Sequence, residues 1–318
     1  MQENTYNGFS VLKNYGEDLT AKKYITDPSI ARDEELKKLM MVLLTPEKSG
    51  LLVGKAGVGK TSIVEGLSYR ILNNMVPQAL QGYRVIKINS SSLTGKINYN
   101  GREELVVTLL VEELMNLSKI ILFIDEIHTL IGNSDNSMDL ANILKPAIDR
   151  GALKLIGATT DIEYNTYIIR DRAFLRRFEK IDVAEPSVQT TIQILFKSLP
   201  KIEASTGIKF KYNDYVTTML LESIVNATSE YKRVYGLGAM YPDIAFSVLS
   251  AAFSEALFQN RQFVTVLDVY NAIKSSKRIY PDSILRELSS FKIKFKDIAI
   301  QEGIEFPNVT LEEISTQE

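Results

Sequence analysis

The sequence contains no cysteine, a single histidine and no long apolar run. Without cysteine the chain forms neither disulfides nor thiolate metal sites, and with His128 as its only histidine it lacks a multi-histidine metal site. No stretch approaches the roughly 20 apolar residues of a membrane-spanning helix. Residues 1–20 are polar and lack the apolar core of a signal peptide. These absences predict a soluble, cytoplasmic chain with no membrane partner.

The charges are nearly balanced, with 37 Lys and Arg against 39 Asp and Glu and a net charge of -2. Because nucleic-acid-binding proteins usually carry a basic face, this balance argues against a nucleic-acid partner, although the net charge does not reveal a local basic patch. The chain has 318 residues, of which 45% are hydrophobic and 24% charged. This length suits two domains, and the composition is that of a globular protein with a sizeable core.

The first half of the chain alternates between strand and helix patterns. After a loosely ordered lead-in (1–26), strands are expected at 51–53, 83–88, 120–124 and 153–157. Helices are expected between them, at 27–44, 61–74, 103–117 and 138–150. This alternation predicts an α/β domain over 27–185, with a parallel sheet covered by helices on both faces.

The pattern changes near Pro186, after which helical spacing dominates. We expect a smaller all-helical domain at 186–280, with Thr265 and Asp268 at capping-box spacing. The tail at 281–318 is ambiguous, and FKIKFKD (291–297) alternates as a strand with a solvated lysine face would.

The segment GKAGVGKT (54–61) follows an apolar strand and precedes a helix. Its glycines allow a tight loop whose backbone N–H groups point at phosphate oxygens, next to the positive end of the helix. Lys60 is expected to reach the β- and γ-phosphates, and Thr61 to bind Mg²⁺. The predicted nucleotide-binding residues of the loop are Gly54, Lys55, Ala56, Gly57, Val58, Gly59, Lys60, Thr61 and Ser62.

Three further elements follow in order. The apolar strand IILFIDE (120–126) ends in Asp125, a candidate Mg²⁺ ligand, and Glu126, a candidate general base. An ordinary acidic turn is the alternative for this pair. The strand LIGATT (155–160) brings hydroxyls to the sheet edge where nucleotides bind, a weak signal by itself. Arg176 and Arg177 have the charge that stabilises a transferring phosphoryl group, but a solvated surface pair would look the same.

Taken together, these segments resemble the AAA+ superfamily, and more narrowly the first ATPase module of the Clp unfoldases of the ClpA, ClpB and ClpC type. The resemblance covers about residues 14–290 and rests on several ordered matches. They are DLTAKKYITDPSIARDEEL (18–36), GKAGVGKTSIVEGLSYRI (54–71), VPQALQGYRV (76–85), FIDEIHTLIG (123–132), NILKPAIDRGALKLIGATTDIEY (142–164), RRFEKIDVAEPSVQTTIQIL (176–195) and VTVLDVYNAIKSSKRIYPDSIL (264–285).

The resemblance implies a P-loop AAA+ large subdomain with a helical lid, ATP and Mg²⁺ as ligands, and roles for single residues. Ile30 and Ala31 stand where the family has Ile-Gly against the adenine. Thr160 occupies the sensor position, and Arg176 and Arg177 occupy the arginine-finger positions that reach a neighbouring subunit. The resemblance therefore implies a homo-oligomeric ring, expected to be a hexamer. His128 is expected to be structural.

The family also carries a pore loop whose aromatic residue grips polypeptide. Here the segment is GKINYNGREE (95–104), and Tyr99 matches the aromatic position. Asn98 and Asn100 replace the family's flanking basic residues. A tyrosine beside Asn-Gly is otherwise typical of a plain turn.

The sequence departs from the family pattern at two positions, and it lacks several segments that the family carries. Ile244 stands where the family has lysine, and Leu175 precedes Arg176 where the family has glutamate. An adaptor domain, an inserted coiled coil and a second ATPase module are not found. Since the protease-docking loop belongs to the second module, we expect no direct docking on a protease ring.

The leading hypothesis is a single-module Clp-like ATPase that hydrolyses ATP at subunit interfaces and remodels or threads a protein substrate. One alternative is a nucleic-acid motor or loader on the same core, which single-stranded DNA would stimulate. Another is an ATP-gated ring or scaffold subunit that acts as the partner of a larger Clp protein.

Overall fold

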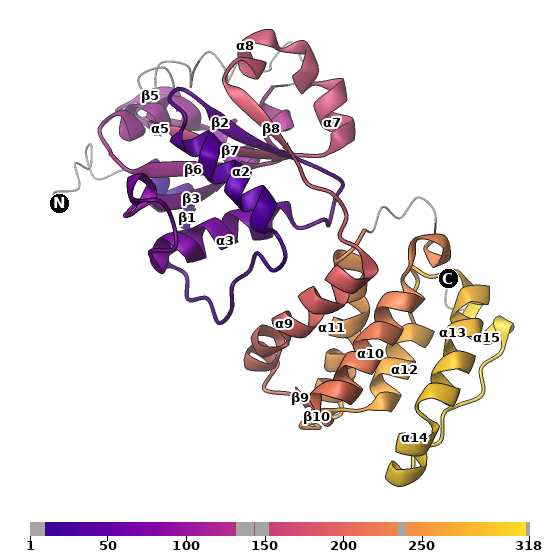
Figure 1. Cartoon of the computed structure of the whole chain (residues 1–318). Coiled ribbons are helices and arrows are strands. Elements are labelled where there is room, and N and C mark those ends of the chain that lie inside the picture. Colours follow the sequence, from indigo (N-terminus) through magenta and orange to yellow (C-terminus); the bar gives the residue numbers. More distant parts are fainter. Residues whose placement is uncertain (1–9, 132–142, 144–152, 235–239, 316–318) are drawn as a thin grey trace. The chain divides into compact units, whose positions relative to one another are not determined.

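The computed structural model describes residues 10–131, 143, 153–234 and 240–315. The chain folds into two compact units (Figure 1). The first unit consists of Met1–Lys55 and Gly59–Ala184, and the second of Ala56–Val58 and Glu185–Glu318. Among the described residues, none of the helices has the length and apolarity that a membrane crossing needs.

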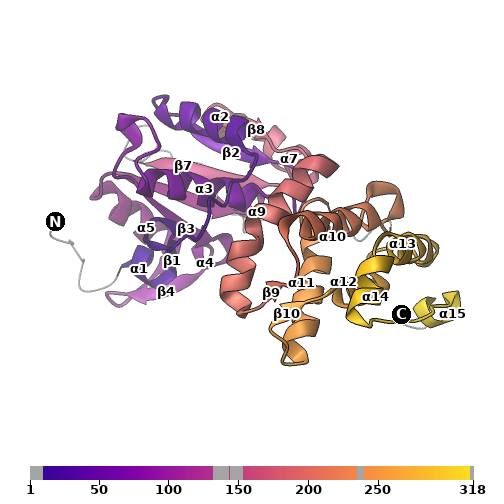
Figure 2. The ribbon, with the colours of Figure 1, turned by 60° about the horizontal axis from the view of Figure 1, so that its bottom comes forward.

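The first unit is built on a six-stranded sheet with the order β1-β3-β6-β7-β2-β8, and Figure 1 labels each of these strands. Figure 2 shows the same sheet from another side. Its strands are β1 (Gly16–Asp18), β2 (Ser49–Val53), β3 (Arg84–Asn89), β6 (Ile120–Asp125), β7 (Lys154–Thr159) and β8 (Phe178–Asp182). All neighbouring pairs are parallel except β1 with β3. The predicted parallel α/β sheet is confirmed, and β8 is an additional strand that the sequence analysis did not predict.

The lead-in is more ordered than predicted. Residues after Ser10 form helix α1 (Val11–Tyr15), strand β1 and the 3₁₀ turn η2 (Leu19–Ala21). Strand β1 completes the edge of the sheet by pairing with β3. The expectation of a loose segment is therefore wrong for residues 11–21, because backbone pairing rather than side-chain periodicity holds this part of the chain.

Helices pack on the sheet as an alternating sequence requires. Helix α5 (Val106–Met115) and α1 share one core with Val53, Ile88 and Ile124 of the strands. Helix α2 (Asp33–Leu44) packs against β2 and β8. The remaining elements are α3 (Lys60–Leu72), α4 (Ser90–Leu93), α7 (Asp161–Thr166), α8 (Arg172–Leu175) and the 3₁₀ turns η3 (Gln78–Leu80), η4 (Ile127–Leu130) and η5 (Ile168–Arg170).

Helix boundaries differ from the predicted ones where the backbone leaves helical geometry. Helix α2 begins at Asp33 rather than at residue 27, because Pro28 and the left-handed Ala31 (φ 56°) precede it. The helix predicted at 138–150 lies outside the described residues, apart from Ile143.

The segment before α5 forms a β-hairpin. Strands β4 (Lys96–Tyr99) and β5 (Arg102–Leu105) are antiparallel, with Tyr99 opposite Arg102. The connecting residues Asn100 and Gly101 both have positive φ, 52° and 78°. Asn-Gly with this geometry matches the twist of a two-residue hairpin. Because Arg102–Leu105 is committed to this pairing, α5 begins at Val106 instead of residue 103.

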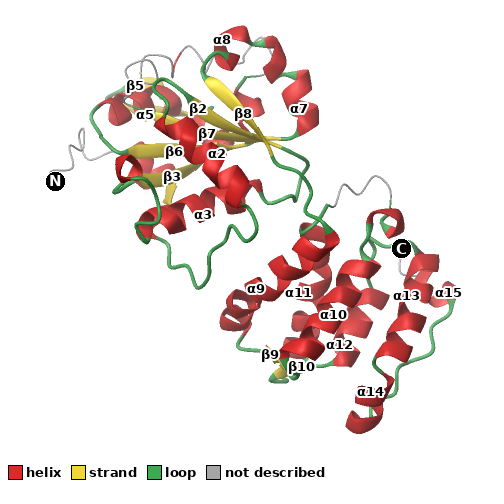
Figure 3. Cartoon of the chain, in the orientation of Figure 1, coloured by secondary structure: helices red, strands yellow, loops and turns green. Residues whose placement is uncertain are grey.

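The second unit is helical, apart from one short strand pair in its described part (Figure 3). Strands β9 (Lys209–Phe210) and β10 (Phe263–Val264) are parallel, an addition to the predicted all-helical lid. The helices are α9 (Val188–Thr206), α10 (Asp214–Ala227), α11 (Asp243–Phe258), α12 (Val266–Lys274), α13 (Pro281–Lys294), α14 (Lys296–Glu302) and α15 (Leu311–Ser315), with the 3₁₀ turn η6 (Glu230–Lys232). The predicted fold class is thus confirmed.

The tail contains helices instead of the suggested strand. Residues 291–297 fall on the end of α13 and the start of α14. Phe291 and Phe295 lie four residues apart and are 2% and 0% exposed in the core of the second unit, whereas Ile293 is 80% exposed. The alternation of the segment was misleading because Phe291 and Phe295 also satisfy helical spacing.

Two substitutions distinguish a helix from a strand at residues 291–297. Phe291→Ala is expected to lower the free energy of unfolding by about 3–5 kcal/mol, because it leaves a cavity in the core of the second unit. Ile293→Ala should change it by less than about 0.5 kcal/mol, because this side chain is exposed. Urea titrations of both variants measure the difference. Equal losses would indicate a shared buried face, as a strand would have, and would contradict the helix.

Candidate functional site

The strands β2, β7, β6 and β3 end side by side at one edge of the sheet. Val53 is in register with Thr159, and Asn89 is in register with Asp125. The N–H of Gly54, the first residue after β2, donates to the carbonyl of Thr159 at 3.3 Å. The loops that follow these strands therefore lie together, at the edge where ligands bind in open parallel sheets.

The glycine loop connects β2 to helix α3. Gly57 and Gly59 have φ of 78° and 100°, which side chains with a Cβ rarely adopt, and Gly59 is the N-cap of α3. The Lys60 Nζ donates to the carbonyls of Gly54 (2.6 Å) and Lys55 (3.0 Å), so this side chain folds back over the loop. Burial lowers the pKa of Lys60 against the opposing attraction of Asp125 and other nearby carboxylates.

Thr61 and Asp125 are in direct contact. The Thr61 hydroxyl donates to the Asp125 Oδ2 at 3.1 Å, so the two predicted metal ligands face one another. Oxygen ligands of this kind suit Mg²⁺, which keeps several waters and takes further ligands from substrate phosphates. Within the described part of the chain, no group of three or more His, Cys, Asp or Glu could hold a metal. The pair therefore fits Mg²⁺ only together with a bound nucleotide.

Glu126 lies just beyond Asp125 at the start of η4. Its side chain is exposed, and its backbone is left-handed at φ 52° and ψ 42°. Its N–H donates to the Asp125 Oδ1 at 3.1 Å, and its carbonyl accepts from the Thr129 hydroxyl at 2.9 Å. Such backbone geometry is uncommon outside glycine and clusters at functional sites. The turn presents the Glu126 carboxylate to solvent while fixing its backbone.

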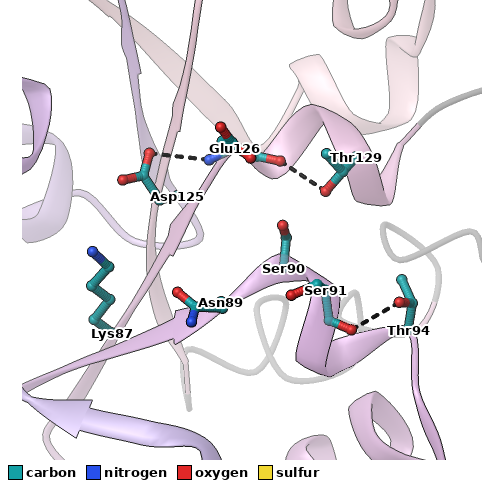
Figure 4. Close-up of a pocket in the computed structure, with 8 residues that line it drawn as sticks. All are labelled: Lys87, Asn89, Ser90, Ser91, Thr94, Asp125, Glu126 and Thr129. Carbon is teal, nitrogen blue, oxygen red and sulfur yellow. Dashed lines mark hydrogen bonds between the residues drawn. The ribbon is translucent and has the colours of Figure 1, made fainter. Parts of the chain in front are cut away.

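A polar cavity of about 460 Å³ opens beside this pair (Figure 4). Lysine, amide, hydroxyl and carboxylate side chains from β3, α4, β6 and η4 line it. They are Lys87, Asn89, Ser90, Ser91, Thr94, Asp125, Glu126 and Thr129. The cavity gives water access to the Glu126 side of the sheet edge.

Thr160 caps helix α7 at the end of β7. Its hydroxyl accepts from the Glu163 N–H at 3.3 Å, and its own N–H donates to the Glu163 Oε2 at 3.0 Å. This reciprocal pair is a capping box, and its Thr-x-x-Glu spacing is visible in the sequence. The sequence analysis singled out Thr160 but missed Glu163, which that spacing could have revealed.

The structure does not bring Arg176 and Arg177 to this edge. The Arg177 carbonyl accepts from the Ser49 N–H at 2.8 Å, and the Arg176 carbonyl accepts from the Lys48 Nζ at 3.0 Å. These contacts are at the start of β2, whereas the glycine loop follows its end. Five residues of strand separate the two edges by roughly 16 Å. The arginines thus lie at the opposite edge of the sheet from Lys60.

The segment before α2 lies against α3. A Cβ on Gly66 of α3 would come within 2.2 Å of Ser29, so the two backbones approach closely. Ile30 is half-buried and Ala31 is exposed and left-handed. The left-handed φ gives a physical reason for the family's glycine at the position of Ala31.

Two other positions singled out in the sequence, Tyr99 and Ile244, are at least partly buried. Tyr99 is half-buried, and it packs with Ile97 of the β4–β5 hairpin against the core of the first unit. Ile244 is fully buried in the core of the second unit. An apolar residue fits there, since a lysine at this position would bury its charge.

Comparison with known proteins shows the family and the fold. Residues 50–183 match the family described as ATPase family associated with various cellular activities (AAA). The chain is 36% identical over 299 residues to Chaperone protein ClpB of Wolinella succinogenes, covering 92% of this chain and 34% of that protein. It is 38% identical over 248 residues to a probable ATP-dependent Clp protease ATP-binding subunit of Chlamydia pneumoniae, covering 76% and 28%. The chain spans about a third of the length of these relatives.

Solved structures of Hsp104 have the same fold. The Hsp104–casein complex of S. cerevisiae in an extended conformation has a TM-score of 0.67 and 35% identity, covering 81% of this chain and 44% of that one. The closed state of Hsp104 with ATPγS and FITC-casein has a TM-score of 0.72 and 33% identity, covering 91% and 49%. The chain thus contains an AAA ATPase domain, and over most of its length it is homologous to the AAA modules of ClpB and Hsp104.

Proposed function

We propose that this chain hydrolyses ATP to ADP and phosphate with Mg²⁺ and uses the cycle to remodel or thread a protein substrate. AAA family membership implies ATP hydrolysis. The observation that carries the proposal is the assembly of Lys60, Thr61, Asp125 and Glu126 at one sheet edge, with Thr61 and Asp125 in contact. This set contains a phosphate-binding cation, a pair of metal ligands and a carboxylate open to water.

The roles follow from position. The loop N–H groups and Lys60 would hold the phosphates, and the Lys60 Nζ would exchange its two carbonyl partners for phosphate oxygens. Bound Mg²⁺ would neutralise charge on the β- and γ-phosphate oxygens. Thr61 and Asp125 would hold that ion from the protein side, and Glu126 would orient a water molecule and accept its proton.

The position of Arg176 and Arg177 supports an active site that is completed by a second copy of the chain. Because Arg176 and Arg177 begin at the opposite edge from the glycine loop, neither serves the nucleotide of its own chain in this proposal. A neighbouring copy would present its arginines instead, where their charge would stabilise the transition state. We therefore propose a ring, with six subunits as the expected number.

The protein substrate is inferred from relatives. The Hsp104 structures that the chain resembles contain casein. In the proposed ring the hairpin with Tyr99 would contact the polypeptide, and the bend at Asn100 and Gly101 would place the aromatic ring near its tip. In this structure Tyr99 is half-buried, so contact with a substrate would require it to turn outward.

Lys60→Ala is expected to weaken ATP binding at least tenfold, because it removes a side-chain cation that folds over the loop. Lys37→Ala is the matched control, since Lys37 is an exposed lysine on α2. Titration with a fluorescent ATP analogue gives both dissociation constants. Equal affinity in the two variants would contradict the phosphate-binding role of Lys60.

A further inference from the structure

One cluster of side chains joins the turn after Glu126 to the loop after β7. The His128 Nδ1 lies 3.2 Å from the Thr159 Oγ1 and 3.2 Å from the Glu163 Oε2. His128 comes from η4, Thr159 from the end of β7 and Glu163 from α7. The imidazole is 14% exposed and Thr159 is 2% exposed. The Glu163 side chain is 31% exposed, so the cluster is buried on the His128 and Thr159 side and open to water at Glu163.

The hydrogen bonds of the cluster converge on one atom. The Glu163 Oε2 accepts from the Thr160 N–H at 3.0 Å and from the Thr159 hydroxyl at 3.1 Å. Burial would raise the pKa of Glu163, but hydrogen bonds from Thr160 and Thr159 and the attraction of His128 lower it. A carboxylate only accepts, so a hydrogen bond from His128 to Glu163 uses the tautomer of His128 that carries a hydrogen on Nδ1.

A second contact fixes the same ring. His128 stacks on Tyr167, with ring centroids 6.1 Å apart and planes at 17°. Glu163 and Tyr167 are four residues apart, so both extend from one side of α7 and its end. The imidazole is thus held by a hydrogen bond at one nitrogen and by a stacked ring, which together set its orientation.

The turn that carries His128 also sets the backbone of Glu126. The Glu126 carbonyl accepts hydrogen bonds from the Thr129 N–H at 3.0 Å and from the Thr129 hydroxyl at 2.9 Å. The left-handed φ of Glu126 would relax if the turn were released. An anchor at His128 would therefore hold the backbone from which the Glu126 side chain extends.

We propose that His128 and Glu163 form a positioning link that couples the orientation of the proposed general base, Glu126, to the proposed phosphate sensor, Thr160. The link rests on the proposed function, since it acts through both of these residues. Neither His128 nor Glu163 touches the reacting atoms in this account. Their effect is geometric, and a small displacement of a catalytic group is enough to slow a reaction strongly.

Three substitutions at His128 separate a hydrogen-bonded link from simple packing. The amide of Asn places an N–H near the position of Nδ1, whereas the amide of Gln places it near Nε2. His128→Ala and His128→Gln should lower kcat for ATP hydrolysis roughly tenfold or more, and His128→Asn should restore most of it. The dissociation constant for ATP should change by less than about threefold in all three, because the link does not contact the phosphates.

A double-mutant cycle tests the pairing. If His128 and Glu163 act as one link, the His128→Ala, Glu163→Ala double variant should lose no more kcat than the worse single variant. Three results would overturn the link: kcat of His128→Ala within twofold of the unaltered protein, equal kcat for the Asn and Gln variants, or fully multiplicative losses in the cycle.

Hydrogen exchange distinguishes failure of the link from failure of the proposed function. If the unaltered protein does not hydrolyse ATP, the proposed function fails and the amides of Thr129 and Thr160 decide the link alone. These amides donate to the Glu126 carbonyl and to Glu163. Faster exchange at both in His128→Ala, with protection restored in His128→Asn, supports the link. Unchanged exchange at Thr129 overturns it.

Discussion

Glu126→Gln is expected to lower kcat for ATP hydrolysis by about 10²- to 10⁴-fold while ATP still binds with an affinity within about threefold of the unaltered protein. Glutamine keeps the size and a hydrogen-bonding oxygen of the side chain, but it cannot take a proton from water. The Glu126 side chain is exposed beside a polar cavity, and no hydrogen bond ties its carboxylate to another described residue. It is therefore available to a water molecule.

Nucleotide affinity should survive this change because other residues hold the phosphates. Lys60 and the loop backbone provide the cation and the N–H groups, and the Thr61–Asp125 pair provides the metal ligands. Glu112→Gln on α5 is the matched control, since it removes an exposed carboxylate that does not line the cavity beside Glu126. Steady-state phosphate release and analogue binding measure the two effects. Turnover near that of the control would contradict the general-base role.

Replacing Arg176 and Arg177 together with Ala should reduce kcat by about 10³-fold or more, the size of effect that an arginine finger has on phosphoryl transfer. A nucleotide should still bind, because the loop and Lys60 remain. The backbone of Arg176 and Arg177 lies beside the start of β2 and just before β8, at the opposite sheet edge from the glycine loop. Loss of turnover in the double variant would therefore point to a site completed by another subunit.

A nearby arginine supplies the control for this prediction. Arg172 on α8 is exposed and precedes the pair by only a few residues, so Arg172→Ala removes the same charge from the same segment. It should leave turnover unchanged to within about twofold. Turnover by the double variant equal to that of Arg172→Ala would show that the pair is an ordinary solvated one.

The sheet and the phosphate loop could be predicted from the sequence because their signals are local. Buried strands such as β6 are continuous apolar runs, here over residues 120–124, and the glycines at 57 and 59 are needed for the left-handed backbone that the structure has. In these segments side-chain pattern and backbone geometry agree, so a short window of sequence suffices.

Other parts of the fold depend on partners far away in the chain. Strand β8 carries the polar residues Glu179 and Lys180 and is a strand because it pairs with β2, more than a hundred residues earlier. Strand β1 likewise depends on β3. The hairpin at residues 96–105 was missed for another reason, since its Asn-Gly turn was noted but the pairing of its flanks was not.

The site was predicted as a set of residues, but its connections were not. The sequence placed Thr61 and Asp125 in one site, yet only the fold shows them in contact. It left His128 as a structural residue, because a single histidine after an acidic pair gives no indication of its neighbours. Its contacts with Thr159 and Glu163 arise from the neighbouring loops that follow β6 and β7.

Co-assembly of two inactive variants tests the shared active site most directly. In an equal mixture of Glu126→Gln subunits with Arg176→Ala, Arg177→Ala subunits, about one interface in four would combine an intact Glu126 with intact arginines. The account predicts turnover well above the sum of the two variants alone, approaching a quarter of the unaltered rate, in particles whose mass shows both subunits. Mixed particles with no turnover beyond that sum would contradict a site divided between neighbouring subunits.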